Sequence, residues 1–137
     1  MSTLKAFLNP TETSETKDVI VSQRFKDDEG NLQPFTIRTI TQTENEHIIK
    51  ACTRQVTSRT GPPTEKLDRT LYQNTLIVAC TVSPDFSQTD LLTSLGVLSP
   101  TEGPGKMLIA GEFAKLVNEI MELNHFNDDD ASEQAKN

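Results

Sequence analysis

Long hydrophobic runs, tryptophan and paired cysteine motifs are all missing from this sequence of 137 residues. A membrane-spanning helix needs about 20 consecutive apolar residues, and the start MSTLKAFLNP lacks the apolar core of a signal peptide. The two cysteines, Cys52 and Cys80, lie inside apolar helical patterns without CxxC spacing, so we expect buried, reduced thiols. These absences predict a cytoplasmic protein that is neither secreted nor bound to a membrane.

Clustered positive charge is missing as well. The chain has 13 Lys and Arg residues against 20 Asp and Glu residues, which gives a formal net charge of −7. Because the basic residues are scattered, the counterion release that drives nucleic-acid binding is not expected. Polar and acidic residues gather near both ends, which predicts a flexible segment over 1–17, one globular domain over 18–126 and a disordered acidic tail over 127–137.

Motifs that carry chemistry are also absent. His47 and His125 have no His or Cys three or four residues away, so neither predicts a metal site. The glycines of EGPGKMLIAGE fit neither a P-loop nor a dinucleotide-binding fingerprint, and GxSxG does not occur. Asp85 and Asp90 flank a predicted helix start, where capping explains a carboxylate. We therefore expect no enzymatic activity, no cofactor and no metal.

Alternating apolar residues predict two strands near the amino terminus. Val19 and Val21 share one face of the first strand, and Phe35 and Ile37 share one face of the second. Gly30, followed by Asn, suits the turn between them. We expect a β-hairpin over residues 18–40, whose open edges would allow pairing with another copy in a homo-oligomer.

Two longer helices are predicted after the hairpin. Thr41 and Glu44 have the spacing of a capping box, and apolar residues at four-residue intervals extend the first helix to about Val56. The second is expected over residues 65–82. Its run LIVACTV also fits a buried strand, but continuity with LDRTLYQNT favours a helix by length.

The remaining elements are shorter, except for the last. A short helix should end at Gly96 in a left-handed conformation, with Val97 making the hydrophobic contact of a Schellman motif. A turn or broken helix is expected over 99–105 and a helix near 106–110. The final helix follows the full amphipathic template with Phe113, Leu116, Val117, Ile120 and Met121 inside, and Glu112, Lys115, Glu119 and Glu122 facing solvent.

The first residues contain one more helical stripe. Leu4, Phe7 and Leu8 have the spacing of one helix face. This spacing fits an anchor onto the domain or onto another subunit, and it fits equally a terminus that packs locally. The complete pattern predicts an α+β fold, a mainly α-helical single domain with an N-terminal antiparallel β-hairpin.

The order of these features resembles the XkdN-like phage tail assembly chaperones, a family of small proteins from tailed phages and PBSX-type prophages. The resemblance spans nearly the whole chain and rests on Val21, Ser22, Arg24, Phe25, Gly30, Phe35, Ile37, Arg38, Ile40, Glu44, Tyr72, Pro84, Leu92, Gly96, Val97, Pro100, Met107, Leu108, Gly111, Glu112, Phe113, Leu116, Ile120, Leu123 and Phe126. Two departures are His125, where the family often has Gly, and TEGPGK, where it has a cleaner helix. We expect Asn124 to supply the left-handed cap instead.

The resemblance implies a chaperone that binds the tape measure protein, a long and largely helical chain, and keeps it soluble until tail tube subunits polymerise around it. The tail tube protein is a further candidate partner. Such a chaperone would act in the cytoplasm of the bacterial host and be absent from the mature virion. The alternative is a structural tail or baseplate component retained in the virion.

Candidate partner-binding residues follow from the exposed or amphipathic apolar positions. They are Phe7, Leu8, Phe113, Leu116, Val117, Ile120, Met121 and Phe126. For the five residues of the final helix stripe, burial in the protein's own core is the favoured interpretation, because such stripes usually face the core.

Overall fold

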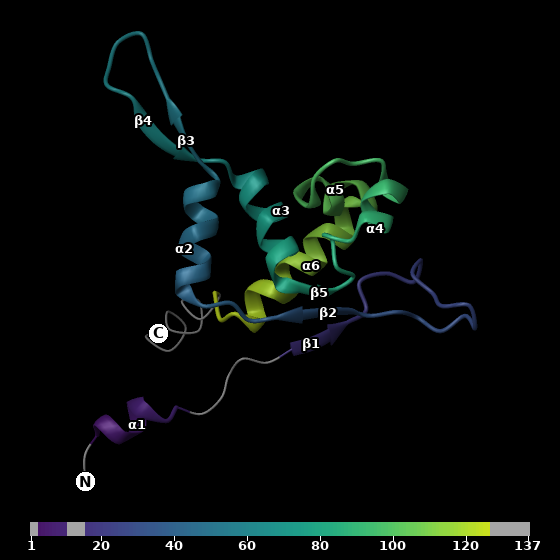
Figure 1. Cartoon of the computed structure of the whole chain (residues 1–137). Coiled ribbons are helices and arrows are strands. Elements are labelled where there is room, and N and C mark those ends of the chain that lie inside the picture. Colours follow the sequence, from purple (N-terminus) through teal and green to yellow (C-terminus); the bar gives the residue numbers. More distant parts are fainter. Residues whose placement is uncertain (1–2, 11–15, 127–137) are drawn as a thin grey trace, which may run out of the picture.

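A three-stranded antiparallel sheet and the helices packed beside it form the structure, a computed structural model that describes residues 3–10 and 16–126. The elements in chain order are α1 (Leu4–Leu8), β1 (Thr16–Val19), β2 (Phe35–Arg38), α2 (Gln42–Ala51), β3 (Thr53–Val56), β4 (Thr64–Leu67), α3 (Arg69–Cys80), β5 (Thr81–Ser83), α4 (Thr89–Leu95), the 3-10 turn η1 (Pro100–Glu102), α5 (Gly103–Met107) and α6 (Ala110–Leu123). Figure 1 shows the β3–β4 hairpin projecting from the helices and α1 lying apart from them. The predicted α+β class is confirmed.

The predicted antiparallel pair near the amino terminus is confirmed, but its sheet has a third strand. β1 pairs with β2 in a register that sets Val19 opposite Phe35. The other edge of β2 is covered by β5, with Ile37 opposite Thr81. The open edges expected on both strands of the hairpin are therefore reduced, because β2 lies in the centre of the sheet. Whether the chain forms a homo-oligomer stays a prediction.

The predicted end of the helix over 65–82 is wrong, because the third strand begins at Thr81. Helix α3 ends at Cys80, and the last residues of the apolar run continue directly into β5. β-branched residues favour a strand, and Pro84 disfavours the helical conformation of the residue before it. The central strand β2 supplies the hydrogen-bonding partner that turns this local preference into a strand.

The start of helix α2 was predicted correctly and its end was wrong. Thr41 Oγ1 accepts the Glu44 N–H at 3.2 Å, and the Glu44 carboxylate accepts the Thr41 N–H at 3.1 Å, which confirms the capping box. The helix ends at Ala51 rather than Val56, because residues 53–56 pair with residues 64–67 as the β3–β4 hairpin. Asp68 then accepts the Leu71 N–H and begins α3 four residues later than expected.

The segment around Gly96 confirms one prediction and corrects another. Gly96 has φ +72°, its N–H bonds to Thr93 O at 3.1 Å, and the Val97 N–H bonds to Leu92 O at 3.1 Å, which completes a Schellman motif. The helix expected near 106–110 instead covers 103–107 as α5, directly after η1. Pro at the first turn of a helix is tolerated, so the sequence GPGK begins α5 instead of interrupting it.

The end of α6 differs from the prediction in one residue. His125, and not Asn124, has the left-handed conformation, with φ +62°. The Phe126 N–H bonds to Met121 O at 2.9 Å and the His125 N–H bonds to Glu122 O at 3.1 Å. These bonds form a second Schellman motif, in which a glycine would be the usual residue at position 125.

The core lies between the sheet and the helices, and its members come from nearly every element. Both cysteines are buried and form no disulfide, as predicted, and burial raises the pKa of Cys80 to about 11. The buried residues of the core cluster are Val19, Val21, Phe35, Ile37, Ile48, Cys52, Leu76, Ile77, Cys80, Phe86, Leu108, Leu116 and Ile120. Two residues that were predicted to lie on the apolar faces of helices are instead exposed in strands. Val56 in β3 is 45% exposed, and Val82 in β5 is 48% exposed.

One charged residue predicted to face solvent is buried. Glu112, at the start of α6, is 8% exposed, and its carboxylate accepts hydrogen bonds from the guanidinium of Arg24, including one from Nε at 3.0 Å. Arg24 also donates to Met107 O at 3.0 Å. This ion pair holds the connection between β1 and β2 against the start of α6. Glu112 is therefore buried by its contact with Arg24, a residue 88 positions away in the chain.

Two predicted segments fall partly outside the described residues. The predicted boundary at 18 lies near the start of β1 at Thr16, and α1 lies within the amino-terminal segment 1–17. Residues 11–15 and 127–137 are outside the described part of the chain, so the flexible segment and the disordered acidic tail remain predictions.

Replacement of Gly103 by Ala should destabilise the fold through overpacking. A Cβ there would lie 2.8 Å from Cδ1 of Phe86, whose ring is 1% exposed and has little room to shift. We expect Gly103→Ala to lower the free energy of unfolding by about 1–3 kcal/mol, measured by urea unfolding followed by circular dichroism. The control is Gly111→Ala on α6, where a Cβ meets nothing within 4 Å; equal effects of the two changes would contradict the packing argument.

Replacement of Glu112 by Gln should change how stability depends on pH. Hydrogen bonds donated by Arg24, and secondly by Ser22, lower the pKa of Glu112 to about 2, below the value of about 4.3 in an unfolded chain. The folded state therefore gains stability above the unfolded pKa, and that gain disappears as the pH falls toward the folded pKa. We expect Glu112→Gln to be less stable than the unmodified protein at neutral pH, with a difference that shrinks below about pH 4.3.

Urea unfolding at a series of pH values tests this expectation. The control is Glu46→Gln, which changes an exposed carboxylate on α2. A difference for Glu112→Gln that stays constant across the pH series would contradict the role of its charge.

Candidate functional site

An apolar groove between α3 and α6 offers a hollow to a partner. Two adjoining hollows, of about 350 Å³ and 180 Å³, share Gln73 and Val117 in their walls. We call them together the α3–α6 groove. Its remaining lining residues are Leu67, Arg69, Tyr72, Leu76, Phe113, Ala114, Asn118 and Met121. The lining is mainly apolar, and Arg69 is the one charged residue in it.

Helical geometry explains why α6 forms one wall. Phe113, Val117 and Met121 follow one another at four-residue intervals, so they form one ridge along the helix. All three are partly buried and pack against the core while they line the groove. Leu116 and Ile120 lie on the adjacent ridge and are fully buried, at 0% exposure. The amphipathic face of α6 is thus wider than its contact with the core, and the surplus lines the groove.

The opposite wall comes from α3 and is held against α2. The Tyr72 hydroxyl donates a hydrogen bond of 2.6 Å to Oδ1 of Asn45, which is 8% exposed on α2. Burial raises the pKa of Tyr72, so its hydroxyl stays protonated as the donor. The ring of Tyr72 therefore presents its apolar surface to the groove from a fixed position.

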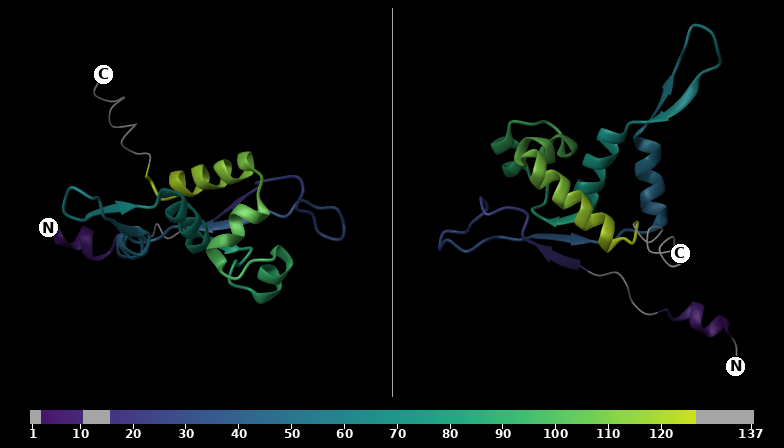
Figure 2. Two further views of the ribbon diagram at one scale, coloured as in Figure 1. Left: turned by 90° about the horizontal axis from the view of Figure 1, so that it is seen from above. Right: turned by 180° about the vertical axis from the view of Figure 1, so that it is seen from behind.

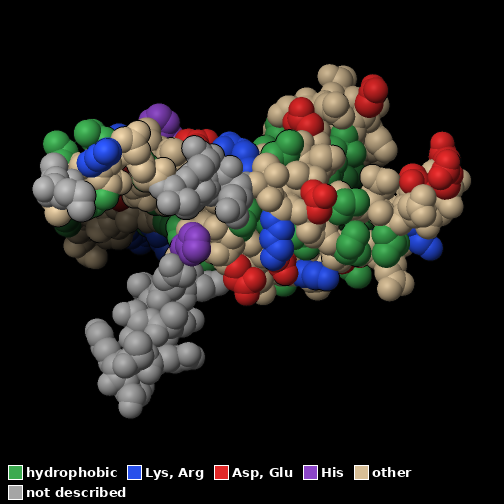
Figure 3. All heavy atoms as spheres, turned by 90° about the horizontal axis from the view of Figure 1, so that it is seen from below, with side chains coloured by type: hydrophobic (Ala, Val, Ile, Leu, Met, Phe, Trp, Pro, Cys, Tyr) green, Lys and Arg blue, Asp and Glu red, His purple; other side chains and the backbone are tan. Residues whose placement is uncertain are grey.

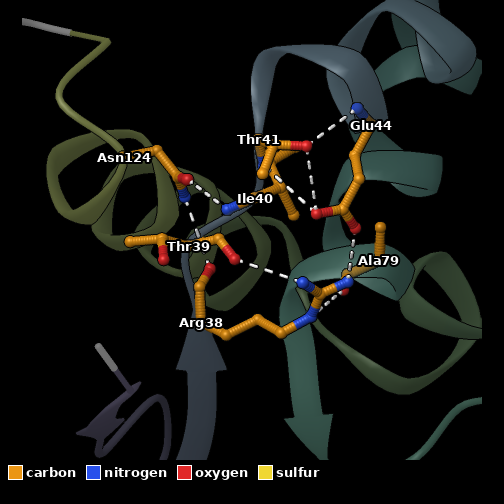
Figure 4. Close-up of polar contacts among 7 residues, drawn as sticks. All are labelled: Arg38, Thr39, Ile40, Thr41, Glu44, Ala79 and Asn124. Atoms are coloured by element: carbon orange, nitrogen blue, oxygen red, sulfur yellow. Dashed lines mark hydrogen bonds and ion pairs between the residues drawn. The ribbon is translucent and has the colours of Figure 1, made fainter. Parts of the chain in front are cut away.

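A polar network fixes the ends of both walls (Figure 4). Arg38, at the end of β2, donates from Nε to Ala79 O on α3 at 3.0 Å and from Nη2 to Glu44 on α2 at 3.0 Å. Asn124, just after α6, accepts the Ile40 N–H at 2.8 Å and donates to Ile120 O at 2.9 Å. The carboxyl ends of α3 and α6 are thereby tied to the same corner between β2 and α2.

The structure separates the predicted partner-binding residues into four groups. Phe113, Val117 and Met121 meet in the groove, whereas Leu116 and Ile120 belong to the core. Phe7 and Leu8 lie on α1 and are 79% and 67% exposed. Helix α1 lies apart from α3 and α6 in Figures 1 and 2.

Phe126, in the Schellman motif after α6, is 37% exposed. Binding by any of these groups stays a prediction. The α3 wall was not predicted as a binding surface, although Leu76 and Tyr72 lie in a predicted apolar helix.

The chemistry of the groove is that of a binding surface. Among the described residues, no group of three His, Cys, Asp or Glu side chains is placed to hold a metal ion. A further hollow of about 160 Å³ lies elsewhere, between Phe25 and Met107. On the face seen from below in Figure 3, hydrophobic side chains are interrupted by acidic and basic ones. In the part of the chain that the structure describes, no helix is long and apolar enough to cross a membrane.

Comparisons with known proteins extend over nearly the whole chain. Residues 4–136 match the family described as phage XkdN-like tail assembly chaperone protein, TAC. The phage-like element PBSX protein XkdN of Bacillus subtilis strain 168 is 31% identical over 137 residues, which cover 96% of this chain and 93% of XkdN. YqbN of the same strain is 32% identical, over 96% of this chain and 92% of YqbN. The crystal structure of YqbN superposes with a TM-score of 0.72 at 28% identity, over 88% of this chain and 94% of that chain.

Replacement of Asn124 by Ala should loosen the corner that fixes the two walls. The change removes the acceptor of the Ile40 N–H and leaves a partly buried donor without its partner, which costs about 1–3 kcal/mol. We expect a lower melting temperature, measured by circular dichroism. Asn118→Ala is the matched control, because Asn118 is an exposed residue of α6, the helix that Asn124 follows. The role of the corner would be disproved if both variants melted at the same temperature.

Proposed function

Because this chain belongs to the XkdN-like family of phage tail assembly chaperones, we propose that it binds the tape measure protein through the α3–α6 groove and keeps that protein soluble during tail assembly. Proteins of such a family have partners in tail assembly and are typically not enzymes. The proposal adds the identity of the partner and the surface that receives it. It also holds that the chain acts in the host cytoplasm without catalysing a reaction.

The observation that carries the proposal is the apolar lining of the groove. A cavity of about 150 Å³ is enough to hold a benzene ring, so the larger hollow of about 350 Å³ has room for roughly two large apolar side chains. Two such side chains one turn apart are what the apolar stripe of an amphipathic helix presents. A largely helical client therefore suits the shape and the chemistry of this groove.

The charge of the chain supports the second half of the proposal. Apolar stripes of an unassembled helical protein promote aggregation when they are exposed. A partner with a formal net charge of −7 covers such a stripe and adds a net charge that keeps the complex soluble. Solubilisation then follows from binding and needs no chemical step.

Co-expression with the tape measure protein of the same phage or prophage tests the proposal. We expect the soluble fraction of that protein to rise in the presence of this chain. The variant Gln73→Trp should abolish the rise, because Gln73 is exposed and borders both hollows, so the larger side chain fills the groove without entering the core. A second variant, Val117→Lys, places a charge in the lining.

The matched control is Leu98→Lys, which introduces the same charge at an apolar residue that is 97% exposed and outside the groove lining. Circular dichroism confirms that each variant is folded. Equal solubility of the tape measure protein with and without this chain would refute the function, whereas full activity of both groove variants would refute the assignment of the groove.

The alternative is a structural tail or baseplate component. A chaperone is expected to be absent from finished particles, so mass spectrometry of purified virions separates the two functions. Detection of this chain in amounts comparable to the tail tube protein would favour the structural role.

A further inference from the structure

The β3–β4 hairpin is an arm with an unpartnered surface. Figures 1 and 2 show it projecting from the ends of α2 and α3, away from the sheet. Only Thr53 and Leu67, which pair at its base, are partly buried, and the other strand residues are exposed. An isolated two-stranded hairpin is marginally stable in water, so an exposed arm of this kind gains stability when a partner covers it.

The arm is positively charged in an acidic protein. Residues 53–67 contain three basic side chains and one acidic one, a net charge of +2, whereas the whole chain has −7. The register sets Arg54 directly opposite Lys66 on one face of the hairpin, and like charges in that arrangement are destabilising. Asp68 lies 3.5 Å from Arg54, but within residues 3–10 and 16–126 no ion pair is formed by Lys66. The arm therefore keeps positive charge that an acidic partner would neutralise.

A second projection has the opposite charge. The connection between β1 and β2 extends from the other end of the molecule in both views of Figure 2, and residues 26–33 contain three acidic side chains and one basic one, a net charge of −2. Asp27 holds the turn, because its Oδ1 accepts the N–H groups of Glu29 and Asn31 at 2.9 Å. Asp28 and Glu29 are exposed at the tip. We call residues 26–33 the acidic loop.

The acidic loop is anchored at its base and so presents its charges in a defined place. Arg24 is bound to Glu112 and to Met107 O, and the ring of Phe25 packs 5.5 Å from that of Phe35, between centroids. The isolated bridge between Lys26 and Leu32 closes the loop above this anchor. Because the acidic loop and the basic hairpin lie at opposite ends, one copy cannot bring its own two arms together.

We propose that the basic β3–β4 hairpin of one copy binds the acidic loop of a second copy, so that the chain associates head to tail. The contact joins two different surfaces and is therefore heterologous, which generates open rows or rings of copies. Each contact is weak in solution because exposed ion pairs contribute little. It does not depend on the proposed function, although a row of copies would suit a long client.

Paired charge reversals test this association by sedimentation velocity. The hairpin variant Arg59→Glu with Lys66→Glu makes both arms negative, and the loop variant Asp28→Lys with Glu29→Lys makes both arms positive. All four residues are exposed, so the fold should be retained, and circular dichroism checks this. We expect the mass of the unmodified protein at low salt to rise from 15.2 kDa through twice that value and beyond as its concentration increases, because head-to-tail association does not stop at two copies. Each variant alone should stay at the mass of one copy.

The decisive sample is an equimolar mixture of the two variants. In this mixture the positive hairpin of the loop variant can bind the acidic loop of the hairpin variant, and the negative hairpin of the hairpin variant can bind the positive loop of the loop variant. Association should therefore return. About 500 mM salt should abolish it by screening. The control Lys106→Glu with Lys115→Glu makes the same change in net charge as the hairpin variant, at exposed positions outside both arms, and should associate like the unmodified protein. A mixture that remains at the mass of one copy would overturn the proposal, as would self-association of either variant alone.

Discussion

The corner around Arg38 is the constraint on which the arrangement of helices depends. A single guanidinium at the end of β2 binds the last turn of α3 and the first turn of α2. Asn124, which directly follows α6, accepts the N–H of Ile40, two residues after the end of that strand, and closes α6 onto the same corner. Each of these bonds satisfies a polar group at a helix or strand end, where regular hydrogen bonding stops. The same bonds hold α2, α3 and α6 together at this corner.

The groove follows from this joint and from the width of the apolar face of α6. With the carboxyl ends of α3 and α6 fixed, the side chains of the two helices leave hollows in the space between the helices. The ridge of Leu116 and Ile120 is enclosed by the core, whereas the neighbouring ridge of Phe113, Val117 and Met121 is partly buried and lines the groove. An apolar surface of moderate size results from this arrangement of the two helices, in a chain of a tail assembly chaperone family.

Local patterns in the sequence predicted what local interactions decide. The capping box of Thr41 and Glu44, the left-handed Gly96 and the amphipathic α6 are set by residues within one or two turns, and all are present. The strands β3 and β5 were missed because a short apolar or β-branched segment takes its conformation from the strand beside it. Glu112 was assigned to solvent for the same reason, since its partner Arg24 is distant in the chain.

For the binding site, the α6 stripe could be proposed from sequence, but its division between core and groove required the position of α3. The resemblance to a family supplied the fold and the class of function without supplying this division. Two amphipathic helices become a groove only when their crossing is known, and hydrophobic periodicity does not report it.

The single tyrosine gives the groove an unusual property. The chain has no tryptophan and one tyrosine, and that residue, Tyr72, lines the groove with its hydroxyl bound to Asn45. Nearly all near-ultraviolet emission of the protein must therefore originate at this one wall. The fluorescence of Tyr72 therefore reports whether the α3–α6 groove is occupied, without an added label. It does not report events at the basic hairpin or the acidic loop, which lie away from Tyr72.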